Sequence, residues 1–323
     1  MKILVAGGAG YIGAHMCRLL AARGHECVVL DDLSTGHREA VCWGRLEQVS
    51  LLDVGALNRV VAEAKPDAVM HFAARSIVSQ AARDPAGYYA NNLIGTLNLL
   101  NAMRASSVQR LVFSSTASVY GEPQQSPVTE DHPLIPLNTY GSSKLAAERM
   151  IADFCSAYGL RAAALRYFNA AGADAAAGIG ESHTPETHLI PNLLRGAASD
   201  QAVSIYGSDY PTRDGTCVRD YIHVTDLCQA HLLALDYLNR QEGFTAMNLG
   251  TGSGYTVREI IAAASSVVGK PIPIREAGRR SGDPAVLVAS SAMAQSRLGW
   301  QPAITDIRAI IASAWEWHRN PRY

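Results

Sequence analysis

Residues 2–13 read KILVAGGAGYIG, and this stretch determines how the first half of the chain folds. Lys2–Ala6 is a short apolar segment suited to a buried parallel strand, and a run of glycines follows it at once. A helix is expected from about Tyr11 to Gly24, where glycine is a typical C-terminal stop. A strand, a glycine turn and a helix in this order let the backbone approach a pyrophosphate at the helix N-terminus.

An acidic pair after the second expected strand indicates which dinucleotide would bind. The apolar segment Cys27–Leu30 ends in Asp31 and Asp32, where a carboxylate can bind the hydroxyls of a ribose. Because a carboxylate repels a 2′-phosphate, the sequence predicts NAD rather than NADP. The plainer interpretation is a glycine-rich turn followed by solvated aspartates, but strand, glycines, helix and acid all fall in order.

Strand-like and helix-like segments alternate through the first half of the chain. Further strands are expected at 67–72, 109–115 and 161–168, with helices at 91–103 and 138–158 between them. Strands that alternate with helices pair in parallel through right-handed crossovers. The predicted fold class is therefore α/β, with a Rossmann-like doubly wound parallel sheet.

The regular alternation of expected strands and helices ends after about residue 171. A loop rich in Gly and Ala is expected at 173–183, followed by a helix at 189–198 and a strand at 203–206. The strand-like segments 221–224 and 246–249 are expected to return to the sheet.

These segments predict two unequal parts. Residues 1–170 would form an NAD-binding domain, to which later segments at about 215–250 return. Residues 171–323 would form a smaller, partly discontinuous C-terminal region that binds substrate. It would cap the carboxyl edge of the sheet, where ligands of open α/β sheets bind.

Composition excludes several classes of function. The chain of 323 residues has a net charge of −1 and no block of like charge, so it lacks the charge pattern that is typical of nucleic-acid-binding or membrane-binding proteins. No apolar run approaches the ~18 residues of a membrane span, and the short apolar start is not expected to be a targeting signal. Six scattered cysteines without a CxxC pair indicate reduced thiols in a cytoplasmic protein, with neither disulfides nor a metal site.

A tyrosine and a lysine four residues apart, in the run YGSSK at 140–144, are the candidate reactive groups. On a helix this spacing puts Tyr140 and Lys144 on one face, about one turn apart. An ammonium beside a phenol lowers the pKa of the phenol, so the tyrosine can take a proton from an alcohol near neutral pH. With a nicotinamide nearby, the expected reaction is alcohol oxidation by hydride transfer. The alternative is that Tyr140 and Lys144 are only neighbours on the surface of a helix, without a role in catalysis.

Further motifs carry a resemblance that covers almost the whole chain. They are GGAGYIG at 7–13, DDLSTG at 31–36, HFAA at 71–74, SSTASVYG at 114–121, YGSSK at 140–144, RYFNAAGA at 166–173, GTCVRDYIHVTDL at 215–227, NLGTGSGYTV at 248–257 and RRSGDPA at 279–285. On these motifs the chain resembles the extended short-chain dehydrogenase/reductase family, and within it the nucleotide-sugar 4-epimerases. The resemblance implies reversible 4-epimerisation of UDP-glucose and UDP-galactose through a 4-keto intermediate, in a homodimer that keeps NAD bound.

The resemblance also implies roles for individual residues. Tyr140 would be base and then acid at the sugar 4-hydroxyl, Lys144 would bind the nicotinamide ribose, and Thr116 would orient the proton transfer. The implied cofactor contacts, besides Tyr140 and Lys144, are Gly7, Gly10, Tyr11, Ile12, Gly13, Asp31, Asp32, Phe72, Ala73, Ala74, Asn91 and Phe168. The implied substrate contacts, besides Thr116, are Asn169, His188, Tyr206, Arg219, Asp283 and Arg280, for which Arg279 is the competing neighbour.

For some of these residues, the sequence leaves alternative roles open. Arg219 is followed by Asp220, so a structural ion pair competes with a phosphate-binding role. The adenine contact falls on Ser50 or, if the register slips, on Asp53. Leu287 stands where the resemblance implies a contact with the C2 substituent of the sugar, and leucine is intermediate between residues that exclude and admit an N-acetyl group.

The residues after Thr116 distinguish between the reactions known in the family that the chain resembles. In that family, 4,6-dehydratases carry Asp-Glu after the corresponding threonine and decarboxylases keep a glutamate, whereas this chain has Ala117 and Ser118. Without those carboxylates, reversible oxidation and reduction at C4 is the expected chemistry. The alternatives are a 4-epimerase of another UDP-sugar (a UDP-N-acetylhexosamine or UDP-pentose), an NAD-dependent sugar-nucleotide dehydrogenase or reductase, and a non-catalytic NAD-binding protein.

Overall fold

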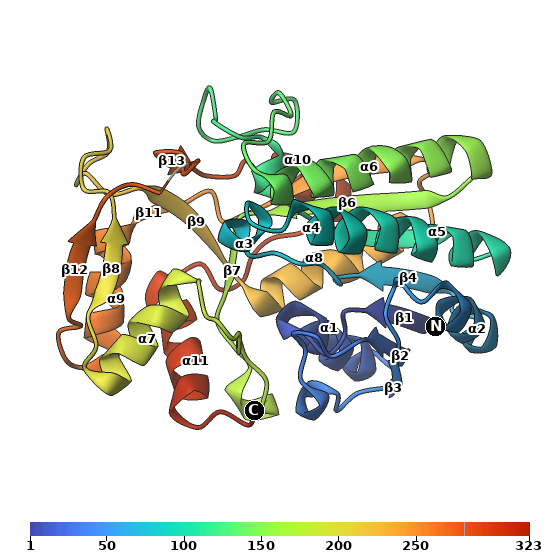
Figure 1. The fold of residues 1–323 in the computed structure, drawn as a ribbon, viewed down its shortest axis with the longest axis horizontal. Coiled ribbons are helices and arrows are strands. Elements are labelled where there is room, and N and C mark those ends of the chain that lie inside the picture. The colour runs from blue at the N-terminus through green and yellow to red at the C-terminus, as the bar shows by residue number, and fades with distance from the viewer. Residues whose placement is uncertain (281) are drawn as a thin grey trace.

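The computed structural model describes residues 1–280 and 282–323, and its largest feature is a sheet of seven strands (Figure 1). The strand order is β3 (Arg45–Gln48), β2 (Glu26–Asp31), β1 (Lys2–Ala6), β4 (Ala68–His71), β5 (Arg110–Thr116), β6 (Arg161–Tyr167) and β10 (Phe244–Leu249). All neighbouring strands are parallel. The order changes direction between β1 and β4, and ligands of such sheets bind at this switch point. The predicted α/β fold class is confirmed.

Helices cover both faces of the sheet, because alternate strand residues point to opposite sides. In β1, Ile3 and Val5 face one core and Leu4 and Ala6 face the other. The helices of the first core are α1 (Tyr11–Ala22), α8 (Val224–Tyr237) and α10 (Ala292–Leu298). Those of the second are α2 (Val54–Ala64), α5 (Gly95–Ala105) and α6 (Thr139–Tyr158). Burial on both sides explains why these strands read as continuous apolar runs.

Short helical turns connect several of these elements. They are α3 (Val78–Ala81), α4 (Pro85–Tyr89), a π-helical turn (Ala90–Ile94) and the 3₁₀ turns Arg38–Ala40, Ala117–Val119 and Ala175–Ala177. Among the described residues, none of the helices combines the length and apolar character that a membrane span needs. All six cysteines are free thiols.

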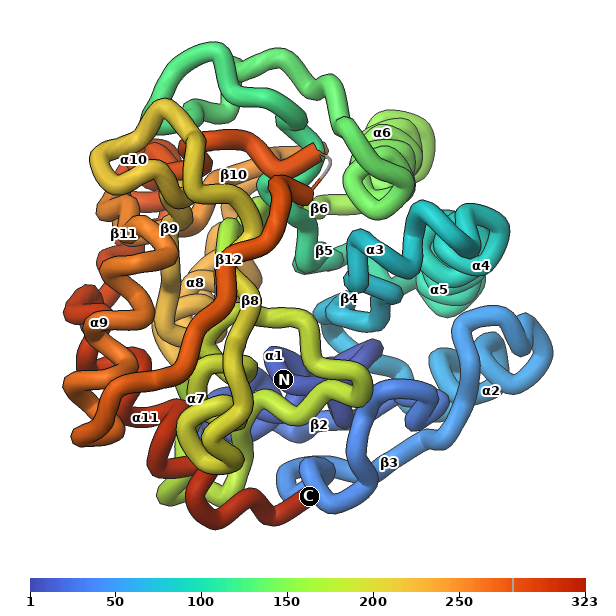
Figure 2. Tube along the Cα trace, turned by 60° about the vertical axis from the view of Figure 1, so that its left-hand side comes forward, coloured from blue at the N-terminus to red at the C-terminus, as the bar shows by residue number. Residues whose placement is uncertain are grey.

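The C-terminal part of the chain packs beside one end of the sheet, on the left in Figure 1. Its helices α7 (Leu189–Ser199), α9 (Val257–Val268) and α11 (Ile307–Arg319) share a core that includes Ile190, Ile260 and Ile310. Its strands are β7 (Asn169–Ala171), β9 (Val218–His223), β11 (Gly254–Thr256) and β13 (Val286–Leu287). A separate parallel pair, β8 (Val203–Tyr206) and β12 (Ile274–Ala277), runs side by side in Figure 2.

The two segments expected to return to the main sheet differ. Strand β10 contains 246–249 and extends the sheet beside β6, as predicted. Strand β9 contains 221–223 but pairs with β7, β11 and β13, so the prediction for 221–224 is wrong. The reason is that β7 leaves the sheet directly after β6 and offers Asn169 as a partner for Tyr221. Helix α8 then begins at Val224 and covers the sheet instead of extending it.

A buried ion pair fastens α6 to the sheet. Arg166 of β6 donates to Glu148 of α6 through Nε at 3.0 Å and Nη2 at 2.6 Å, and the two side chains are 5% and 3% exposed. The third nitrogen of Arg166 donates to the Tyr120 hydroxyl at 2.9 Å, which donates to Asn248 of β10 at 2.7 Å. Breaking such a pair leaves an uncompensated buried charge.

Replacing Glu148 by alanine tests this pair. We expect Glu148→Ala to lower the free energy of unfolding by about 3–5 kcal/mol, because Arg166 keeps its charge in a buried site. Urea denaturation of the purified proteins measures the change, and Glu63→Ala, at an exposed carboxylate of α2, is the matched control. A loss in Glu148→Ala no larger than that of the control would show that α6 does not depend on the pair.

Candidate active site

The turn between β1 and α1 is built for close approach of a ligand to the backbone. A Cβ on Gly13 would lie 2.0 Å from the carbonyl oxygen of Gly7, so only glycine lets the first turn of α1 pack there. Helix α1 begins after Gly10, and among the described residues no side chain caps its N-terminus. Its uncapped N–H groups and positive dipole end suit the diphosphate of a dinucleotide. Tyr11 and Ile12 form this first turn, and the Tyr11 hydroxyl donates to the Gly172 carbonyl at 2.6 Å.

Asp31 lies at the end of β2, beside this turn. Its carboxylate accepts the Ala9 N–H at 2.9 Å and the Leu33 N–H at 2.9 Å, one bond on each oxygen. Burial raises the pKa of Asp31, and these two bonds oppose the rise. Each oxygen keeps a lone pair for a further donor, which suits a ribose diol. Asp32 accepts the Ser34 N–H in an exposed turn, so Asp31 is the better placed of the two.

The end of β4 meets the same turn. Phe72 and Ala73 both donate their N–H groups to the Ala6 carbonyl, at 2.7 and 3.0 Å, and Ala74 follows. The ring of Phe72 lies 4.8 Å from that of His231 on α8. These residues therefore lie at the switch point of the sheet.

Three further cofactor candidates have contacts of their own. Asn91, in the π-helical turn, donates to Asn92 at 3.0 Å, and Asn92 donates to the Ser143 hydroxyl of α6 at 3.0 Å. Asp53 caps α2 by accepting the Ala56 N–H at 3.0 Å, and Ser50 accepts the Leu52 N–H at 3.3 Å. Asp53 thus has a helix-capping role that the sequence analysis had not considered.

Helix α6 brings Tyr140 to the end of β5. Asn138 caps the helix by accepting the Gly141 N–H at 2.8 Å. A Cβ on Gly141 would lie 2.4 Å from the carbonyl oxygen of Ser118, so glycine permits this approach. The Thr116 side chain lies near the Tyr140 hydroxyl and acts to lower its pKa. Thr116 Oγ1 accepts the Ser118 N–H at 3.1 Å, which leaves its own proton free for a further acceptor.

Burial dominates the electrostatics of Tyr140 and Lys144. It lowers the pKa of Lys144 to about 7, which the Glu148 carboxylate opposes, and the ammonium lies 4.2 Å from the centre of the Phe113 ring. Burial also raises the pKa of Tyr140 well above its ordinary value, and the neighbouring Thr116 side chain only partly offsets this. The expected lowering of the Tyr140 pKa by Lys144 is therefore not produced by the protein side chains alone.

Three of the candidate substrate residues, Asn169, Tyr206 and Arg219, lie on C-terminal strands. Thr116 pairs with Tyr167, and Asn169 follows two residues later, so β7 begins within about 8 Å of Tyr167. The Asn169 amide donates to the Asp220 carbonyl on β9 at 2.8 Å. The neighbouring position on β9 is Arg219, which brings a guanidinium to this strand.

Arg219 does not pair with Asp220. Its guanidinium lies 3.3 Å from the Asp283 carboxylate, and its Nη1 donates to the Pro284 carbonyl at 2.8 Å. The Asp220 carboxylate instead accepts the backbone N–H groups of Thr251 at 2.9 Å, Gly252 at 3.0 Å and Ala289 at 3.2 Å. The structural ion pair considered from sequence therefore forms with Asp283, another candidate substrate residue.

The two neighbouring arginines, Arg279 and Arg280, have different partners. Arg279 pairs with Asp209 at 2.7 Å and lies over the Tyr210 ring. Arg280 lies over the Tyr206 ring, 3.8 Å from its centre, and no ion pair of Arg280 is found within residues 1–280 and 282–323. Arg280 is therefore the arginine whose charge is available to an anion.

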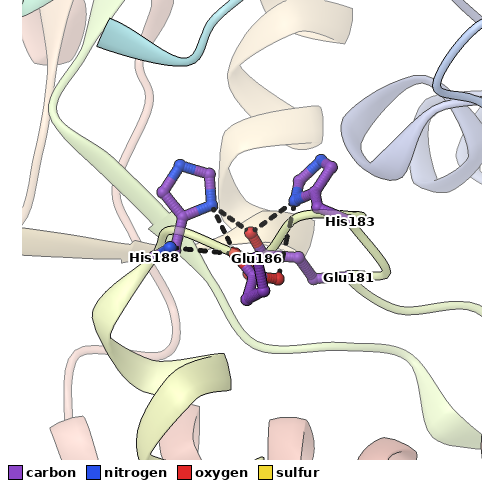
Figure 3. A group of neighbouring side chains, drawn as sticks. All are labelled: Glu181, His183, Glu186 and His188. Atoms are coloured by element: carbon purple, nitrogen blue, oxygen red, sulfur yellow. Dashed lines mark hydrogen bonds and ion pairs between the residues drawn. The ribbon is translucent and has the colours of Figure 1, made fainter. Parts of the chain in front are cut away.

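His188 lies in a cluster that the sequence analysis missed. Figure 3 shows its imidazole beside Glu181, His183 and Glu186. The sequence does contain a signal for this cluster, because four residues with metal-ligating side chains lie within the eight positions 181–188. Their spacing matches none of the common metal-binding motifs. His188 contacts Glu181 and Glu186 here.

A parallel doubly wound sheet, a glycine turn beside Asp31, and Tyr140 near Thr116 at the end of β5 are together typical of dinucleotide-dependent enzymes of the Rossmann type. The chain belongs to the NAD dependent epimerase/dehydratase family, whose model matches residues 3–250. The predictions of this family and of NAD as its cofactor are thereby confirmed.

Known proteins resemble the chain over nearly its full length. A UDP-glucose 4-epimerase of Rhizobium leguminosarum bv. trifolii is 49% identical over 98% of this chain and 97% of its own. The crystal structure of UDP-glucose 4-epimerase from Brucella ovis in complex with NAD has a TM-score of 0.94 and 47% identity, and covers 97% of each chain. The UDP-Glc/GlcNAc 4-epimerase from Campylobacter jejuni has a TM-score of 0.85 and 38% identity, and covers 98% of this chain and 99% of its own.

The lowered pKa of Lys144 predicts a pH dependence of stability. The ordinary pKa is 10.5 and the folded value about 7, so between these the unfolded chain binds one more proton than the folded protein. Stability from this residue is therefore lost as pH falls toward 7. In cofactor-free protein, the free energy of unfolding should rise from pH 7.5 to 9 by about 1–2 kcal/mol more in wild type than in Lys144→Met. Urea titrations at both pH values measure this, and parallel pH profiles would contradict it.

Proposed function

We propose that the chain interconverts UDP-glucose and UDP-galactose by NAD-dependent oxidation and reduction at C4 of the sugar. The observation that carries the proposal is that the Tyr140 hydroxyl lies near the Thr116 side chain, which is followed along the chain by Ala117 and Ser118 instead of carboxylates. One phenol can move one proton to and from an alcohol, which reversible chemistry at C4 requires. The UDP-glucose 4-epimerases of Rhizobium leguminosarum and Brucella ovis, at 49% and 47% identity, support it.

In this proposal the protein side chains handle the proton. Tyr140 takes the proton of the 4-hydroxyl and returns it after the 4-keto sugar has turned its other face, while Thr116 orients the transfer. Lys144 binds the nicotinamide ribose. When bound, NAD supplies a reversible hydride acceptor whose positive charge favours the tyrosinate. Since burial alone keeps Tyr140 protonated, a nearby positive charge is needed for the base form.

The cofactor would lie on the switch point of the sheet. The uncapped N-terminus of α1 would hold the diphosphate and Asp31 the adenosine ribose. The remaining proposed contacts are Gly7, Gly10, Tyr11, Ile12, Gly13, Asp32, Phe72, Ala73, Ala74, Asn91, Tyr140, Lys144 and Phe168. This corresponds to an NAD-binding part over residues 1–170 with segments from 215–250.

The nucleotide sugar would lie between that part and the C-terminal strands of 171–323. Arg219 and Arg280 would bind the diphosphate, since a guanidinium fork suits phosphate oxygens. Asp283 would bind the uridine ribose, with Asn169 near the phosphates and Tyr206 near the uracil. The contact of Arg219 with Asp283 supports a shared site for these two residues.

A homodimer and a cytoplasmic location remain predictions. The proposed dimer interface is formed by the π-helical turn with α5, which carry the run NN..GT at 91–96, and by α6, which carries YGSSK at 140–144. Two apolar side chains near these helices support it, since Ile94 is 46% and Tyr158 50% exposed. A sedimentation mass equal to one chain of 34.5 kDa would contradict it.

The defining experiment supplies UDP-galactose and no added cofactor to the purified protein. Chromatography resolves the products while absorbance at about 340 nm reports NADH. We expect UDP-glucose to form without matching NADH, because the hydride returns to the same sugar. NADH in step with product would identify a dehydrogenase instead, and no conversion would redirect the assay to UDP-pentoses and UDP-N-acetylhexosamines.

Tyr140→Phe tests the proposed base in the same assay. Turnover should fall by about 10²–10⁴-fold while fold and bound NAD are retained, because only the proton-transferring hydroxyl is removed. Tyr158→Phe, at an exposed tyrosine of the same helix, is the matched control and should keep wild-type turnover. Near-normal activity of Tyr140→Phe would remove Tyr140 from the mechanism.

Leu287 is the proposed determinant of sugar choice. It packs against a cluster that contains Ala117, the residue after Thr116, so a change at Leu287 alters space close to the proposed sugar site. We expect Leu287→Ala to raise the turnover of UDP-N-acetylgalactosamine relative to UDP-galactose, whereas Val286→Ala, on the opposite side of β13, should not. An unchanged substrate ratio in Leu287→Ala would place the determinant elsewhere.

A further inference from the structure

Four side chains with metal-ligating atoms meet in the segment that precedes α7. Glu181, His183, Glu186 and His188 each offer one nitrogen or oxygen, and these four atoms lie within 4.8 Å of one another (Figure 3). None of them is assigned to the proton transfer at Tyr140. Two imidazoles and two carboxylates in one place form a ligand set suited to a divalent transition metal.

The distances from His183 Nδ1 to the two carboxylates are close to those of a four-coordinate site. His183 Nδ1 lies 3.2 Å from Glu181 Oε1 and 3.7 Å from Glu186 Oε2, and His188 Nδ1 lies 3.6 Å from Glu186 Oε1. Zinc bonds of about 2.0–2.2 Å in a tetrahedron place ligand atoms roughly 3.3–3.6 Å apart. His188 Nδ1 and Glu181 Oε1 are closer than this and share a hydrogen bond, so this one contact would open when a metal enters.

Burial provides an independent indication of a ligand. The Glu186 side chain is 1% exposed, and its Oε1 is fixed by the N–H groups of Thr187 at 2.7 Å and His188 at 2.8 Å. Its other oxygen, Oε2, and His183 Nδ1 are both buried without a hydrogen-bond partner among the described residues. Buried polar atoms are normally partnered, because leaving them unpaired costs free energy. Both atoms belong to residues of the proposed ligand set.

The backbone of the segment is held in place from two sides. The Trp317 indole of α11 donates to the Glu181 carbonyl at 3.1 Å. From α7, Arg195 donates to the His183 carbonyl at 3.3 Å and Asn192 to the Glu186 carbonyl at 3.4 Å. The ligands are therefore carried by a backbone that neighbouring helices already position, as a preformed metal site requires.

We propose that Glu181, His183, Glu186 and His188 bind one divalent transition-metal ion of the Zn²⁺ type. Ca²⁺ and Mg²⁺ prefer all-oxygen sites, whereas two imidazoles with two carboxylates suit Zn²⁺. Four protein ligands close the coordination sphere, which is typical of structural rather than catalytic zinc. The metal would clamp segment 181–188 against α7 and α11, and His188 would serve it instead of the substrate. The epimerase proposal does not depend on this site.

Metal analysis of untagged protein tests the proposal directly. Protein stripped with a chelator, then dialysed against Zn²⁺ and freed of excess, should retain one Zn²⁺ per chain and unfold at a higher temperature. Glu186→Gln and His183→Gln should bind Zn²⁺ more than about 10-fold more weakly by calorimetry. Glu122→Gln, at an exposed carboxylate, is the matched control and should bind like wild type. No retained Zn²⁺ in wild type, or equal retention in both cluster variants, would overturn the proposal.

Cobalt substitution keeps the proposal testable if the cluster variants fail to fold. Co²⁺ added to stripped wild-type protein should give the strong visible absorption of a four-coordinate site with nitrogen and oxygen ligands, and Zn²⁺ should abolish it. Only the weak spectrum of six-coordinate aqueous Co²⁺ would overturn the proposal. UDP-galactose turnover of the same samples distinguishes this result from a failure of the epimerase proposal, because Tyr140 lies outside the cluster.

Discussion

The buried ion pair between Arg166 and Glu148 is the interaction on which the candidate active site depends. Arg166 pairs in register with Ser115, the residue before Thr116, and Glu148 lies one turn after Lys144 on α6. One buried pair therefore fixes the helix that carries Tyr140 and Lys144 against the strand that carries Thr116. Because neither charge can be left alone in the interior, the helix and the sheet are constrained to a single arrangement.

The same burial sets the protonation states in the site. In the protein alone, burial favours a neutral Tyr140 phenol and lowers the pKa of Lys144 to about 7. The polypeptide thus opposes the ionisation that alcohol oxidation needs, and the charge that a ligand brings decides whether tyrosinate forms. This arrangement would link the reactive state of the proposed base to an occupied site.

The C-terminal region contributes charge and shape from strands that are distant in sequence. Strand β7 leaves the main sheet next to Thr116 and pairs with β9, which places Arg219 beside Asp283 of the segment leading to β13. The cluster of Glu181, His183, Glu186 and His188 lies in the segment that follows β7 along the chain. A metal clamp there would stabilise a connection that carries little regular secondary structure.

The sequence by itself determined the parallel sheet, the glycine turn with Asp31, and the Tyr140–Lys144 spacing. These features are encoded by short-range periodicity and by motifs whose members are neighbours in sequence. Only the tertiary structure decided that β9 pairs outside the main sheet, that Arg219 contacts Asp283, and that burial raises the pKa of Tyr140. These outcomes depend on which distant segments become neighbours and how deeply they are buried, and local patterns contain neither quantity.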